Sequence, residues 1–160
     1  MQFAYHRSLG PMMGVLLGLA IIEMLVVHLV VVAWLGGWAA LVIGMVDLSA
    51  VIGLVWLIRS FRRRPVTLRD GVLTLHAGYL QSIAVPVDQI AGLRATWDAA
   101  AIKDRGLLNL ALIAWPSVVI DLKAPIAPRR GRQVRAVAHK LDDPAAFHAA
   151  IAALSRADGY

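Results

Sequence analysis

The pattern of hydrophobic and polar positions changes once along the chain, at Pro65. Residues 11 to 58 are almost continuously apolar and hold only three ionisable groups. After Pro65, short stretches of alternating apolar and polar residues are separated by turn residues such as Asp70-Gly71. A long apolar run predicts helices that cross a membrane, whereas alternation predicts strands buried on one face. The pattern therefore predicts an N-terminal membrane part, residues 1–64, and a C-terminal β-rich domain, residues 65–160.

The apolar part predicts a hairpin of two transmembrane helices. Residues 12–35 and 38–58 are each long enough, at about 1.5 Å per residue, to cross a hydrocarbon core of roughly 30 Å. Gly36 and Gly37 leave room only for a tight turn, so both outer ends should face the same side. A cleavable signal peptide is the alternative, but its apolar region should be only about 7–15 residues long and should not run into a second span.

Basic residues predict which side the two ends face. Arg7 precedes the first span, the turn has no basic residue, and a basic segment follows the second span, formed by Arg59, Arg62, Arg63 and Arg64. Lys and Arg are enriched in cytoplasmic segments next to a span. We therefore expect a multi-pass membrane protein with both termini in the cytoplasm, whose arginines contact anionic lipid headgroups.

Small residues predict how the two spans meet. Gly14 and Gly18 lie on one helical stripe that continues to His28, and Gly44 lies on a stripe of the second span that continues to Asp47. Counted from the turn, His28 and Asp47 are at similar depth, so we expect them to contact each other. The contact either satisfies two polar groups that lipid cannot, or serves a proton relay or a haem or metal site.

Glu23 falls nearly opposite that stripe and faces away from the partner helix. An unpaired carboxyl group in lipid is costly. Glu23 therefore either contacts a polar group on another chain, which makes a second membrane protein or a homo-oligomer a candidate partner, or stays protonated, or takes part in transport or proton transfer.

The region after Pro65 predicts an α+β fold of seven strands and one helix. A polar loop is expected at residues 98–106, and acidic residues followed by Pro144 predict the start of a C-terminal helix with Phe147 and Ile151 on its apolar face. Such a domain suits a small, curved antiparallel barrel capped by the helix. The expected strands are residues 66–69, 72–76, 79–87, 93–97, 107–115, 117–122 and 132–141.

The order of these elements and their sequence motifs resemble those of bacterial membrane-anchored proteins with a pleckstrin-homology-like (PH-like) domain. The shared features are two transmembrane helices, a strand pair with a DG turn, the segment VPVDQI (85–90) and a closing helix that begins LDDPAAF. The resemblance implies a PH-like barrel. It does not imply phosphoinositide binding, because the first hairpin places only Arg69 beside Asp70 and has no basic cluster.

Charge adds one further candidate site in the C-terminal domain. The chain has 16 Lys and Arg and a net charge of +6, and the densest group is PRRGR (128–132). This group is either a solvated loop or a second contact for anionic headgroups. We expect no nucleic acid as partner, because no aromatic residues are interleaved to stack bases. The residues concerned are Arg129, Arg130, Arg132 and Arg135.

No arrangement of residues predicts catalysis, a metal or a cofactor. The chain has no cysteine, and His76, His139 and His148 fall on separate elements without a zinc-type motif. Asp121 and His139 are expected on solvated strand faces. The sequence therefore predicts a non-enzymatic inner-membrane protein whose PH-like domain binds a protein or anionic lipid. The alternative is an accessory subunit of a membrane transport or redox complex that uses Glu23, His28 and Asp47.

Overall fold

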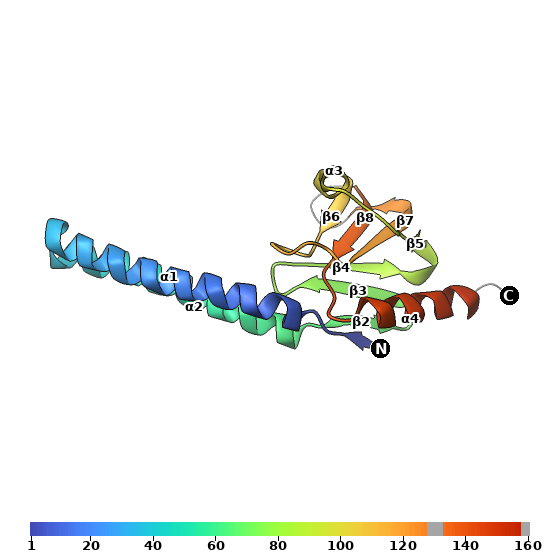
Figure 1. The fold of residues 1–160 in the computed structure, drawn as a ribbon, viewed down its shortest axis with the longest axis horizontal. Helices are drawn as coiled ribbons and strands as arrows, with labels where there is room; N and C mark the ends of the chain where they lie inside the picture. Colours follow the sequence, from blue (N-terminus) through green and yellow to red (C-terminus); the bar gives the residue numbers. More distant parts are fainter. Residues whose placement is uncertain (128–132, 158–160) are drawn as a thin grey trace. The chain divides into compact units, whose positions relative to one another are not determined.

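The computed structural model describes residues 1–127 and 133–157 (Figure 1). It is an α+β chain in which two long apolar helices precede two β-sheets and a C-terminal helix. The chain divides into two compact units. Leu9–Ser60 forms the helical unit, whereas Met1–Ser8 joins Phe61–Tyr160 in the unit that contains the sheets, here called the β unit. The first eight residues therefore fold with the β unit although they precede the first apolar helix.

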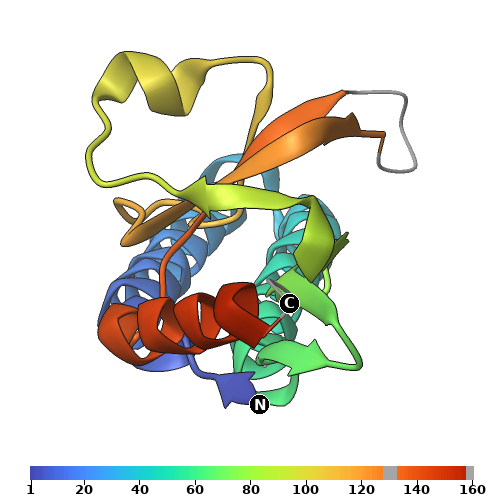
Figure 2. The ribbon, with the colours of Figure 1, turned by 90° about the vertical axis from the view of Figure 1, so that its right-hand side faces the viewer.

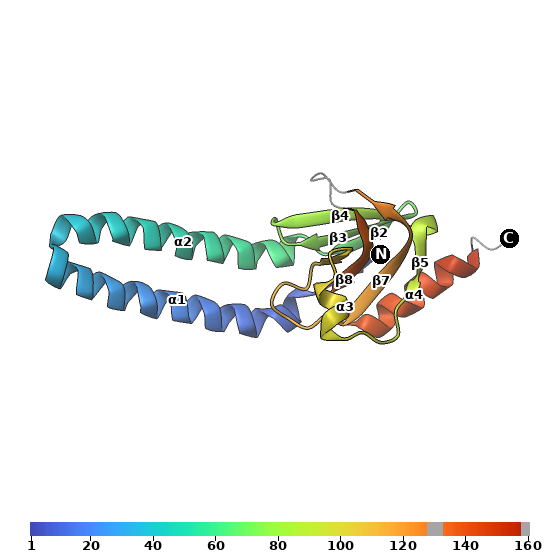
Figure 3. The same cartoon turned by 90° about the horizontal axis from the view of Figure 1, so that it is seen from above.

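The helical unit is a hairpin of α1 (His6–Leu35) and α2 (Gly37–Arg63). The helices run side by side and meet at a one-residue turn (Figure 3). Gly36 makes this turn with φ of 82°, a conformation that costs other residues free energy. Both helices are long and apolar enough to cross a membrane. In the most apolar stretch of each, only 6 % and 0 % of the residues are buried.

The β unit contains two four-stranded sheets. The first has the order β1-β2-β3-β4 and is antiparallel throughout, and the second has the order β5-β7-β8-β6, with β6 parallel to β8. The strands are β1 (Gln2–Phe3), β2 (Val66–Arg69), β3 (Val72–Ala77), β4 (Gln81–Pro86), β5 (Ile90–Leu93), β6 (Leu107–Asn109), β7 (Val118–Ile126) and β8 (Val134–His139).

The sheets differ from the expected barrel of seven antiparallel strands. In the described residues the strand pairing forms two sheets and does not close a barrel. A two-residue strand, β1, was not expected from the sequence, because it exists only through its pairing with β2. The parallel pair of β6 and β8 was not expected either, since it depends on the path of the intervening chain.

Strand bounds also differ locally from the prediction, as at β5, which ends at Leu93 where a strand was expected to begin. Side-chain capping explains two other differences. The expected loop at residues 98–106 contains the short helix α3 (Ala99–Lys103), whose first turn is capped by Asp98 Oδ1 accepting from Ala101 N at 2.7 Å. The expected strand at residues 107–115 ends at Asn109, whose side-chain oxygen accepts from Ala111 N at 2.9 Å. Such local bonds compete with sheet pairing.

The core of the β unit follows the predicted alternation in its first sheet. Leu73 and Leu75 in β3 are buried, and their neighbours are less so. The helix α4 (Pro144–Ala157) lies beside β1 and β2 (Figure 2) and buries Phe147 and Ile151. Here the sequence prediction of a C-terminal helix with an apolar stripe is confirmed. Asp143 caps the helix by accepting from Ala146 N at 2.9 Å.

Candidate functional site

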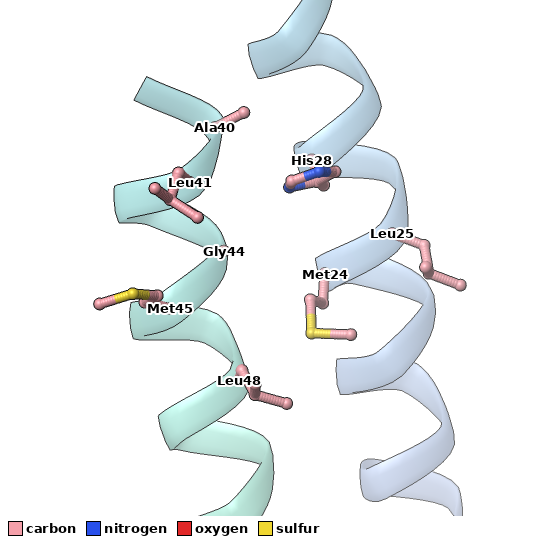
Figure 4. A pocket seen from close by; sticks show the side chains of 8 residues that line it. All are labelled: Met24, Leu25, His28, Ala40, Leu41, Gly44, Met45 and Leu48. Atoms are coloured by element: carbon pink, nitrogen blue, oxygen red, sulfur yellow. The ribbon is translucent and has the colours of Figure 1, made fainter. Parts of the chain in front are cut away.

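The polar residues of the hairpin are the first candidate site. His28 points from α1 toward α2, where its Nδ1 lies against Gly44 (Figure 4). A Cβ atom placed at Gly44 would come within 3.2 Å of this nitrogen, so any larger residue there would require the imidazole to shift. The space around this contact is an apolar groove of about 350 Å³, lined by Met24, Leu25, His28, Ala40, Leu41, Gly44, Met45 and Leu48.

His28 and Asp47 are not joined by a hydrogen bond in the part of the chain that the structure describes. Asp47 is half-buried, and its Oδ2 atom is buried without a hydrogen-bond partner among the described residues. The imidazole lies instead on Gly44, one helical turn from Asp47, because the missing side chain of glycine leaves space there. The predicted contact between these two polar groups thus forms no hydrogen bond among the described residues, and the imidazole packs on the Gly44 backbone.

Glu23 is exposed on α1. It is not grouped with His28 and Asp47 into a metal site, because residues 1–127 and 133–157 contain no cluster of three or more His, Asp or Glu side chains suited to a metal ion. Gly14 and Gly18 make no close contact with α2, since a Cβ added at either would meet nothing within 4 Å. The helix contact thus uses Ala40 and Gly44 of α2, but not the two glycines of α1.

The basic residues at the end of α2 are the second candidate site. All four arginines predicted to contact headgroups there are exposed: Arg59, Arg62, Arg63 and Arg64. Arg135 is exposed on β8, where its side chain lies beside Gly106. Arg129, Arg130 and Arg132 fall outside the described residues. The guanidinium groups at the end of α2 and that of Arg135 are exposed and therefore accessible to anions.

A third cluster, centred on Tyr5 in the β unit, was not found by sequence reasoning. Tyr5 is fully buried, and its ring lies 5.9 Å from that of Phe61 and 4.9 Å from that of His139. Its hydroxyl oxygen accepts from Gly78 N at 3.0 Å. Burial raises the pKa of Tyr5, opposed by the Gly78 hydrogen bond and the charge of Arg64. The only signal in the sequence was an aromatic residue shortly before the first apolar helix.

His139 lies in this cluster, which corrects the expectation of a solvated strand face. It is fully buried, with Nε2 at 2.8 Å from the carbonyl oxygen of His76 and Nδ1 at 3.0 Å from that of Lys140. Asp121 is engaged elsewhere, in a two-point ion pair with the guanidinium of Arg94. Asp121 and His139 therefore have separate partners.

Other residues at the start of the chain fix the cluster in place. The amino nitrogen of Met1 donates to Leu68 O at 2.7 Å, and the ring of Phe3 meets that of Phe147 edge-on at 5.2 Å. Asp142 N donates to Ala4 O at 2.9 Å. The residues ahead of α1 thus form part of the core of the β unit.

Comparison with protein-family models, with curated proteins and with solved structures finds no match for this chain. The PH-like resemblance stays a prediction, and function rests on the geometry described above.

Proposed function

We propose that the chain is an integral membrane protein without enzymatic activity, whose β unit is held at the membrane surface as an interaction module. The observation that carries this proposal is the apolar surface of the hairpin. Side chains such as Leu29, Trp34 and Met45 are 70 %, 86 % and 63 % exposed, along helices with almost no burial. Soluble monomers rarely expose continuous apolar patches of this extent, whereas lipid solvates them.

The structure of the first residues supports an anchor rather than a cleaved signal peptide. Cleavage behind α1 would remove β1 and the buried ring of Tyr5 from the β unit. Truncating a buried aromatic residue alone costs about 3–5 kcal/mol of folding stability. Retention of α1 therefore preserves the core of the β unit, and the two ends of the hairpin lead into the same folded unit.

The exposed arginines at the end of α2 support a surface role for the β unit. Each basic residue beside an anionic leaflet contributes about 1 kcal/mol to membrane attraction. Their position after the second span also favours the cytoplasmic face of a bacterial inner membrane. We propose that the β unit has a PH-like architecture, supported by its two sheets and single closing helix, and that its partner is anionic lipid, a second membrane protein or another copy of the chain.

Single cysteines test the topology, because the chain has none of its own. We expect Trp38→Cys, near the turn, to react with a membrane-impermeant maleimide from the outer side of bacterial cells. Gln2→Cys and Arg69→Cys, both exposed in the β unit, should react only after the cytoplasmic side is opened. The unmodified chain is the control for background labelling. Labelling of Trp38→Cys and Arg69→Cys from the same side, or release of the protein by alkaline carbonate, would show that the hairpin does not cross the membrane.

A further inference from the structure

Two loops of the β unit expose large apolar side chains at positions that the sequence had placed in strands. The turn between β3 and β4 carries Tyr79 and Leu80, which are 49 % and 55 % exposed. The segment between β6 and β7 carries Ile113 and Trp115, which are 48 % and 56 % exposed. We call these four residues the apolar rim. They are the exposed large hydrophobic residues found in the described part of residues 61–157.

The first loop of the rim is held beside the residues that precede α1. Gly78, at the start of the turn, donates its N–H to the hydroxyl of Tyr5 at 3.0 Å. Tyr5 is one residue from the start of α1, and its ring neighbour Phe61 lies in the last turn of α2. Tyr79 and Leu80 therefore lie at the end of the β unit where the chain leaves for the first apolar helix and returns from the second.

The second loop is held at the same place by another route. Ser117, which closes the loop, donates its N–H to His139 O at 2.9 Å, and the His139 ring meets the Tyr5 ring at 4.9 Å. Both loops lie at the same end of the β unit, where they connect the ends of strands (Figure 1 and Figure 3). The turn at Asp70-Gly71 is at the opposite end of β3, six residues or about 20 Å away.

The second loop is built to keep its apolar side chains outside. Its two ends are fixed, because Leu110 and Ala111 are buried at one end and Pro116 at the other. Leu112 adopts a φ of 57°, a left-handed conformation that is uncommon for leucine and persists only where surrounding contacts enforce it. Ile113 and Trp115 are thus exposed by a well-defined backbone.

We propose that the apolar rim inserts into the membrane interface, so that the β unit rests on the bilayer by two loops as well as through the hairpin. Trp and Tyr favour the headgroup level, where the ring is partly apolar and its polar edge stays hydrated, and Leu and Ile reach the acyl chains. The exposed Arg62 and Arg64, beside Phe61, supply charge complementary to anionic headgroups. This inference rests on the proposed function, since it requires the hairpin to be in the bilayer.

The test uses the full chain with one cysteine at a time, labelled with the environment-sensitive fluorophore NBD. Leu80→Cys and Ile113→Cys report on the rim, Arg69→Cys reports on the opposite end of the first sheet, and Leu29→Cys reports on the hairpin. Each is reconstituted in vesicles of phosphatidylcholine and phosphatidylglycerol, with and without lipids that carry a nitroxide quencher on the acyl chain. We expect strong quenching at position 29, and quenching at 80 and 113 that exceeds that at 69 by about twofold or more.

The outcomes separate this inference from the proposed function. Quenching at position 29, with positions 80 and 113 no more quenched than 69, would overturn the inference and leave the membrane hairpin intact. No quenching at position 29 would overturn both. A blue-shifted emission at 80 and 113 without lipid quenching would identify the rim as a protein contact and would likewise overturn the inference.

A second variant tests whether the rim acts as one surface. Trp115→Ser should reduce the quenching of the label at position 80, because both side chains would anchor the same end of the β unit. Trp38→Ser, an exposed residue near the hairpin turn, is the matched control and should leave that quenching unchanged. An unchanged circular dichroism spectrum checks that Trp115→Ser still folds. Equal quenching in the two variants would show that Trp115 does not hold the rim at the membrane.

Discussion

His139 is buried in the core of the β unit, and both of its ring nitrogens lie within hydrogen-bond distance of backbone carbonyl oxygens. A neutral imidazole has one N–H, so only one of the carbonyls of His76 and Lys140 accepts a hydrogen bond from the ring at a time. Protonation would satisfy both carbonyls but would bury a charge. Burial outweighs the two hydrogen bonds and lowers the pKa of His139, and the nearby His76 adds to this effect. The pKa of His76 is itself lowered, by burial and by the charge of Arg64.

These lowered pKa values predict that the β unit loses stability in acid. Both histidines have lower pKa values when folded than the unfolded value of about 6.5, so the unfolded state binds more protons. Stability is therefore fully present above about pH 6.5 and falls as the pH drops below it, by at most about 1.4 kcal/mol per pH unit for each titrating histidine. Urea unfolding of the detergent-solubilised chain between pH 5 and 8 measures this slope.

Substitution separates His139 from the other titrating groups. His139→Gln should flatten the pH dependence of stability below about pH 6.5, because glutamine does not titrate. It should also lower the stability at neutral pH, because the glutamine side chain does not reproduce the packing and hydrogen bonding of the imidazole between the two carbonyls. His148→Gln, on the exposed face of α4, is the matched control and should keep the wild-type slope. An unaltered slope in His139→Gln would assign the acid sensitivity to His76 or to carboxylates.

At the scale of elements, the contact between α1 and α2 depends on two small residues of α2. Ala40 is buried, and Gly44 accommodates the imidazole of His28. The stripe of Gly14 and Gly18 predicted that His28 faces α2, but the two glycines themselves make no close contact, because sequence spacing shows which residues share a stripe and not where along it the helices come closest.

Gly44→Leu should separate the helices of the hairpin. The new side chain has no space beside His28, and overpacking of this kind costs about 1–3 kcal/mol. Spin labels on Leu29→Cys and Val42→Cys, both exposed, should move apart by a few ångström, on the order of 2–4 Å. Gly18→Leu is the control, since nothing lies within 4 Å of its Cβ position, and should leave the distance unchanged. A similar change in both variants would show that the helices do not meet at Gly44.

At the scale of the whole molecule, the two compact units are solvated in different ways. The β unit is held by a buried core that excludes water, whereas the hairpin exposes its apolar side chains and satisfies its backbone hydrogen bonds internally. Urea weakens the buried core of the β unit much more than the helices of the hairpin when detergent or lipid covers those helices. The units should therefore unfold separately.

Unfolding in detergent micelles should show this separation. We expect urea to remove the strand signal in one cooperative step while most of the helical signal remains. The long helices contain 30 and 27 residues, whereas α3 and α4 contain only 5 and 14. Far-UV circular dichroism across a urea titration measures both signals. A single transition that removes strands and helices together would contradict the division into two units and would show that they stabilise each other.

How far the sequence predicted the candidate sites depended on the kind of signal. The arginines after the second span were predicted as an exposed basic segment, because charge next to an apolar run is a local property. The cluster of Tyr5 and His139 was missed, since these residues are separated by 134 positions in the chain and meet only through the folding of the β unit. The apolar rim was missed for the same reason, because its two loops belong to different sheets and are linked through the packing of Tyr5 against His139.

The sequence by itself determined the two long apolar helices, the turn at Gly36, the strand alternation around Asp70-Gly71 and the C-terminal helix. Each depends on periodicity, turn residues or caps within a few positions, and these act before any tertiary contact is made. Only the tertiary structure decided that residues 1–8 belong to the β unit, that β6 runs parallel to β8, and that His28 packs on Gly44. These features depend on side-chain packing and strand pairing between segments that are distant in the sequence, and not on the local conformational preferences of the residues.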